Sequence, residues 1–134
     1  MRAFLALCFA LSTTCLAGEE AHFYGTWEPR PALRAFWRPV RDSWWQPAQG
    51  TQTPQLARHC KEFAKRNTPE AIIPEMIADL KASPSEVRWF VYLSVMLHWP
   101  QKRVLQVLAP FDASNDPATH HIANEFVADV ESHE

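Results

Sequence analysis

The sequence has few glycines and cysteines, and it has no apolar run long enough to cross a membrane. Of its 134 residues only three are glycine and three are cysteine. A phosphate-binding loop needs closely spaced glycines, which positions 18, 25 and 50 do not provide. The sequence also lacks a nucleophile elbow and a paired-carboxylate motif. We therefore expect a protein that is not an enzyme and that binds no cofactor.

The first residues have the layout of a secretory signal peptide. Met1 and Arg2 precede an apolar run over residues 3–11, and small and polar residues follow up to Ala17. The run is shorter than the roughly 20 residues that span a bilayer. We expect cleavage after Ala17, an exported protein in the periplasm or medium, and no transmembrane helix after signal removal. Lipidation of Cys15 is the alternative interpretation.

Removal of residues 1–17 leaves Cys60 as the only cysteine, so no internal disulfide can form. The remaining chain is long enough for one domain with its own core. Its charge is unevenly distributed. Residues 28–66 hold eight basic and three acidic side chains, whereas residues 70–134 hold four basic and ten acidic ones. A dipolar molecule is expected.

Prolines recur at the spacing of helix starts. Pro54, Pro69, Pro84, Pro100 and Pro117 lie 15 to 17 residues apart, and all except Pro100 follow Ser, Thr or Asp. Such a pair is typical of an N-cap followed by proline in the first helical position. Ser83 and Glu86 have the spacing of a capping box. Five helices with short turns are predicted, and the last-but-one ends at Pro110.

Apolar residues recur between these starts at helical spacing. Three amphipathic stripes are expected, and they consist of Leu56, Cys60, Phe63 and Ala64, of Ile73, Met76, Ile77 and Leu80, and of Ile122, Phe126, Val127 and Val130. Residues 87–99 are apolar on nearly all sides, which indicates a buried central helix. Its most buried face should carry Phe90, Leu93 and Leu97, and Ser94 and His98 should form a buried pair. Pro74 should kink the second helix.

The segment from Ile73 to Leu80, followed by Pro84-Ser85-Glu86-Val87-Arg88, resembles a HEAT repeat. In that family the first helix carries a proline and the second opens with a Val-Arg pair. The resemblance covers the C-terminal half only, because Thr119-His120-His121 replaces the Val-Arg pair in a second unit. It implies an all-α stack of antiparallel helix pairs over residues 53–134, with a surface that binds another protein. An unrelated small helical bundle is the alternative.

Residues 18–52 form an arm rich in Trp, Arg and Pro that does not match the helical pattern. As a binding arm, its guanidinium groups would bind phosphate or carboxylate and its indoles would stack on a ligand. The candidate binding residues are Arg30, Arg34, Trp37, Arg38, Arg41, Trp44 and Trp45. In the alternative, which we favour, the indoles cap the apolar end of the helices, and Trp37 and Trp44 contact Leu56 and Phe63. Exposed indoles without a partner promote aggregation.

The histidines offer no catalytic or metal site. His121 and Glu125 are one helical turn apart, but two ligands are too few for a closed zinc site. His59 and Cys60 are adjacent on a helix and so point about 100° apart, which is poor geometry for a base and a nucleophile. The predicted function is therefore a protein-binding or scaffold module. The alternative is binding of nucleic acid, glycan or a membrane surface through the arm.

The signal-peptide pattern predicts that the exported protein begins near Gly18. Terminal sequencing of exported protein measures this directly. Retention of Met1, or a diacylated Cys15, would contradict soluble export.

Overall fold

The structure is a computed structural model that describes residues 27–40, 45–46 and 51–133. The predicted signal peptide, 1–17, lies outside the described residues. The arm contributes the short helices η1 (Pro31–Leu33), α2 (Arg34–Trp37) and η2 (Arg38–Val40). The helical domain contributes α3 (Pro54–Arg66), α4 (Pro69–Ala82), α5 (Glu86–Met96), α6 (Gln101–Asp112) and α7 (Pro117–Glu131). The predicted all-α class is confirmed.

Three helices begin where the proline pattern predicts. The Thr53 hydroxyl accepts a hydrogen bond from the Leu56 amide at 3.2 Å, and Thr68 and Asp116 cap α4 and α7 in the same way. In each case proline follows the cap, where its missing N–H removes no helical hydrogen bond. The cap therefore determines where the helix starts.

The predicted start of α5 was wrong by two residues. The N-cap is Ser85, whose hydroxyl accepts from the Arg88 amide at 3.2 Å, and not Ser83. Ser83 instead ends α4, and its carbonyl oxygen accepts from the Arg88 guanidinium. The contact between Ser83 and Arg88 holds Pro84 in the turn, so the predicted capping box does not form.

Pro110 does not end α6, contrary to prediction. The helix continues to Asp112, and the Ala113 amide still donates to the Ala109 carbonyl at 3.0 Å. A proline in the last turn removes a single backbone hydrogen bond, and the helix tolerates the loss there. Pro74 also lies within a helix, as predicted for α4.

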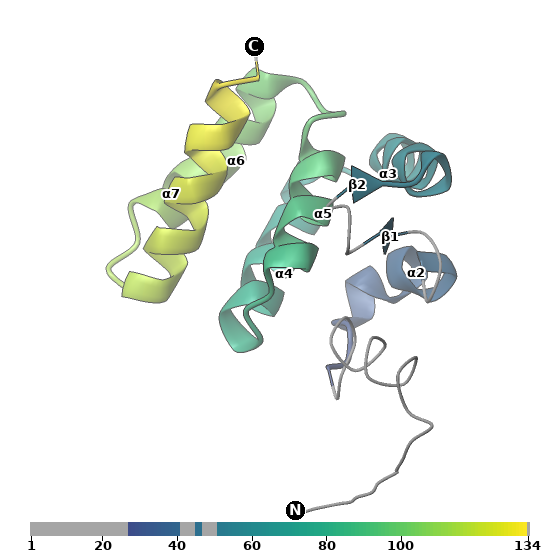
Figure 1. Cartoon of the computed structure of the whole chain (residues 1–134). Helices are drawn as coiled ribbons and strands as arrows, with labels where there is room; N and C mark the ends of the chain where they lie inside the picture. Colours follow the sequence, from purple (N-terminus) through teal and green to yellow (C-terminus); the bar gives the residue numbers. More distant parts are fainter. Residues whose placement is uncertain (1–26, 41–44, 47–50, 134) are drawn as a thin grey trace, which may run out of the picture.

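The helices form three adjacent pairs (Figure 1). The hairpin of α4 and α5 occupies the middle, α6 and α7 cover one side, and α3 with the arm covers the other. Contacts between α3 and α5 and between α4 and α6 link elements that are not consecutive in sequence. Such contacts are expected when helical hairpins stack. No described helix has the length and apolar character needed to cross a membrane.

The arm also contains a feature that the sequence did not predict. Residues 45–46 and 51–52 pair as two short antiparallel strands, with Trp45 opposite Gln52 and Gln46 opposite Thr51. Only these two short strands, β1 (Trp45–Gln46) and β2 (Thr51–Gln52), occur in the described part of the chain. No strand interrupts residues 54–131, where the helical period was predicted.

The core joins residues from the arm and from all five long helices. The predicted stripes of α3 and α4 are buried throughout, and α7 buries Ala123, Phe126 and Val130. Ile122 and Val127 are only partly buried against this core. From the arm, Leu33, Phe36, Trp37 and Val40 join the same cluster.

The buried face of α5 differs from the prediction. Phe90 is 45% exposed and Leu97 is 39% exposed, whereas Leu93 is 7% exposed. The side chains that face inward are Arg88, Val91, Tyr92, Leu93, Val95 and Met96. The helix contacts α3, α4 and α7, which leave the strip from Phe90 to Leu97 uncovered. His98 is exposed as well, so the predicted pair of Ser94 and His98 is not buried. The Ser94 hydroxyl donates to the Phe90 carbonyl at 3.0 Å.

Leu93 on α5 and Leu97, the C-cap of this helix, are four residues apart and test this assignment. Replacing Leu93 by Ala should lower the free energy of unfolding by roughly 2 to 5 kcal/mol, because it leaves a cavity in the core. Replacing Leu97 by Ala should cost about 1 kcal/mol or less, since that side chain is already largely in water. Urea unfolding of both variants measures the difference. Equal losses would contradict the burial described here.

Candidate functional site

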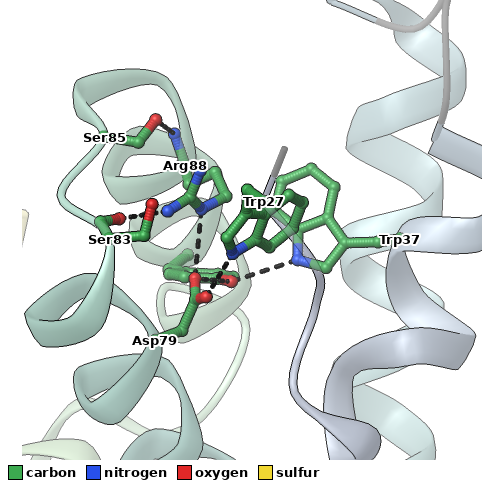
Figure 2. Close-up of polar contacts among 7 residues, drawn as sticks. Trp27, Trp37, Asp79, Ser83, Ser85 and Arg88 are labelled. Carbon is green, nitrogen blue, oxygen red and sulfur yellow. Dashed lines mark hydrogen bonds and ion pairs between the residues drawn. The ribbon is translucent and has the colours of Figure 1, made fainter. Parts of the chain in front are cut away.

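A buried polar network fastens the arm to the middle hairpin (Figure 2). Asp79 on α4 and Arg88 on α5 are 2% and 3% exposed, and Arg88 Nε lies 3.1 Å from Asp79 Oδ2. The Tyr92 hydroxyl donates to the same oxygen at 2.7 Å. Trp27 Nε1 donates to the other carboxylate oxygen, Oδ1, at 2.5 Å. Asp79 therefore accepts from three donors that come from two separate segments.

The arm adds aromatic contacts to this network. Trp37 Nε1 donates to the Tyr92 hydroxyl at 3.0 Å. The Arg88 guanidinium carbon lies 4.0 Å from the centre of the Trp27 ring, a cation–π arrangement. Trp27 also meets Trp37 edge-to-face with ring centres 5.3 Å apart. Arg88 is thus surrounded by a carboxylate, a carbonyl and an indole face.

Burial raises the pKa of two groups in the core. Burial raises the pKa of the Tyr92 phenol, and the adjacent Asp79 carboxylate raises it further. Burial also raises the pKa of the Cys60 thiol to about 12. Because the thiolate is the reactive form of cysteine, Cys60 is a poor nucleophile in this fold. Its neighbour His59 bonds to the backbone carbonyl of Phe36 through Nε2 at 2.7 Å.

The candidate residues of the arm differ in their exposure to solvent. Trp37 is 2% exposed in the core, where a ligand cannot reach its ring. Trp37 is therefore buried, as the cap interpretation predicts, although the ring contact described with Phe63 comes from Phe36. Arg30 is exposed and pairs with Glu75 on α4 at 2.7 Å.

Of the remaining five candidate residues, two are exposed, and the side chains of the other three lie outside the described part of the structure. Arg34 and Arg38 are exposed on α2 and η2. Arg41 and Trp44 lie outside the described residues, and Trp45 is described only through the backbone of β1. The seven candidates therefore do not form a single described surface.

The described histidines form no metal site. Within residues 27–40, 45–46 and 51–133, no group of three or more His, Cys, Asp or Glu side chains could hold a metal ion. His121 Nε2 lies 3.4 Å from Glu125 Oε2, and His120 Nδ1 lies near Asp112. Both histidines lie on the exposed surface of α7.

A groove lies between α5 and α7 on the described surface. Its volume is about 460 Å³, within the range of roughly 300 to 1,000 Å³ common for ligand sites. The floor is apolar, and the groove is lined by Leu80, Pro84, Ser85, Glu86, Trp89, Phe90, His121, Ile122, Glu125, Ala128 and Asp129. Sequence reasoning missed this groove, because Phe90 was assigned to the core.

Trp89 fixes the shape of the groove. Its ring stacks on the buried Phe126 at 5.0 Å with 8° between the planes, and it meets Phe90 edge-to-face at 5.1 Å. The indole Nε1 is buried and has no hydrogen-bond acceptor among the described residues. An unpaired buried donor costs about 1 to 3 kcal/mol. Ring packing therefore sets the position of Trp89, and its indole N–H is left without a described acceptor.

Comparison of the chain with protein-family models, with curated proteins and with solved structures found no match. The resemblance to HEAT repeats therefore stays a prediction.

Tyr92 gives the network a testable dependence on pH. Replacing it by Phe should cost about 1 to 3 kcal/mol at pH 7, because Trp37 Nε1 loses its acceptor and Asp79 a donor. The pKa of the folded phenol is raised above its ordinary value near 10, so its contribution is complete below pH 10 and decreases as the pH rises above it. The difference in unfolding free energy between the two proteins should therefore shrink above about pH 10.

Urea unfolding at pH 7, 9 and 11 measures this difference. Tyr24 and Cys60 are present in both proteins, so their titration cancels. A difference that stays constant across this range would show that Tyr92 is not buried against Asp79.

Proposed function

We propose that this chain is an exported, non-enzymatic module that binds another protein through the groove between α5 and α7. The main observation is the 45% exposure of Phe90 at the edge of a concave site whose floor holds Trp89. Large aromatic side chains around a concave site are typical of the anchors of protein interfaces. The core does not need Phe90, since α5 buries other side chains instead.

The contacts that hold the walls of the groove in place favour a preformed binding surface. Trp89 is held by Phe126 from below, and the turn before α5 is held by the contact between Arg88 and the Ser83 carbonyl. Both walls are long helices that pack on the common core. A preformed site loses little conformational entropy on binding, which favours affinity.

A second candidate function uses the arm. Arg34 and Arg38 are exposed, are one helical turn apart, and form no described ion pair. Two such guanidinium groups suit a polyanion such as nucleic acid, an anionic glycan or an anionic membrane surface. We favour the groove because the tryptophans described in the arm, Trp27 and Trp37, are committed to the buried network.

Two exposed apolar residues, Phe90 on α5 and Leu97 at its C-cap, provide the test and its control. The exported protein is immobilised and used to enrich partners from the exported fraction, alongside Phe90→Ser and Leu97→Ser. The wild-type protein and Leu97→Ser should enrich the same partner, and Phe90→Ser should lose most of it, with a cost of about 2 kcal/mol or more expected for an interface anchor. Leu97 is 39% exposed, close to the 45% of Phe90, but it does not line the groove.

Two outcomes would contradict the groove as the binding site. Equal enrichment by Phe90→Ser and wild type would contradict the groove. Loss of enrichment only in the double variant Arg34→Ala, Arg38→Ala would transfer the function to the arm. Circular dichroism of each variant confirms that the helices are retained.

A further inference from the structure

The groove between α5 and α7 carries negative charge that the described part of the chain does not neutralise. Glu86 lies on the α5 side, and Glu125 and Asp129 lie on α7. Among the described residues that line the groove, His121 is the only nitrogen base, and it lies beside Glu125. Neither Glu86 nor Asp129 forms a described ion pair.

The cations nearest in sequence are already engaged. Lys81 pairs with Asp116 at 2.8 Å, Arg88 pairs with the buried Asp79, and Arg103 pairs with Glu70 at 2.7 Å. The fourth cation of residues 70–134 is Lys102 on α6, which does not line the groove. Among the described residues, therefore, no lysine or arginine lines the groove.

Apolar side chains line the groove together with these carboxylates. Trp89, Phe90 and Ile122 are among them, and the volume of about 460 Å³ accommodates a large apolar side chain. A segment that inserts such a side chain brings its flanking residues over the carboxylates. Opposite charges across an interface increase both the association rate and the specificity.

We propose, on the basis of the protein-binding function above, that the groove binds a segment of a partner protein in which an apolar anchor is flanked by lysine or arginine. The anchor fills the space above Trp89 and Phe90. The flanking cations pair with Glu86, Glu125 and Asp129. A segment with acidic flanks is rejected by the same three carboxylates.

Two synthetic peptides of about 12 residues test the charge of the partner. Both have the same leucine and phenylalanine face, and their polar positions are all lysine in one and all glutamate in the other. Binding is followed by the shift of the Trp89 indole N–H signal in NMR spectra, which the Trp89→Phe variant identifies. The lysine peptide should bind at least about tenfold more tightly than the glutamate peptide.

Two charge variants on α7 show whether the carboxylates of the groove cause the preference for the lysine peptide. Asp129→Asn should weaken the lysine peptide about threefold or more, whereas Glu131→Gln, at the end of the same helix and outside the groove, should leave it nearly unchanged. Equal weakening by both variants would show a general attraction to the acidic half, and it would overturn the proposal. So would equal affinity for the two peptides, or no shift of the Trp89 signal.

Sedimentation of the protein alone tests a second copy of the chain as the occupant. Self-association that disappears in Phe90→Ser would also overturn the proposal. Each of these results leaves the protein-binding function to be judged separately, by the comparison of Phe90→Ser with Leu97→Ser. Failure of that comparison would instead remove the function itself.

Discussion

The buried ion pair between Asp79 and Arg88 is the constraint on which the rest of the structure depends. A charged pair that is almost fully buried is costly unless its remaining polar atoms are satisfied. Here Asp79 also accepts from Trp27 and Tyr92, and Arg88 also contacts the Ser83 carbonyl and the Trp27 ring. These partners come from the arm, from α4 and from α5. The pair therefore specifies how the three segments meet, because any other register would leave a buried charge without its partners.

The position of the groove follows from this constraint. Arg88 and Tyr92 face the arm and α4, which sets the rotation of α5 about its axis. Neighbouring helical residues point about 100° apart, so Trp89 and Phe90 must face elsewhere. Trp89 consequently stacks on Phe126 of α7, and Phe90 is left at the surface. The same polar network that fastens the arm thus exposes the aromatic edge proposed to bind a partner.

Ion pairs elsewhere in the fold explain why the groove keeps its negative charge. The basic half of the chain contributes Arg30 to an ion pair with Glu75, which links the arm to α4 from outside the core. Three of the four cations in residues 70–134 pair with carboxylates that do not line the groove, and the groove keeps its negative charge. Charge left at a concave apolar site is more consistent with recognition than with folding, because the fold gains nothing from keeping like charges close together.

The sequence by itself determined the all-α class, the helix starts at Pro54, Pro69 and Pro117, and the buried stripes of α3 and α4. These features depend on local caps and on a helical period that can be counted along the chain. The tertiary structure decided which face of α5 is buried, and it corrected Phe90, Leu97 and His98. A helix that is apolar on most sides has no preferred face until its neighbours are placed. The groove could not be foreseen for the same reason, since Glu86 and Asp129 lie 43 positions apart and meet only because α7 packs against α5.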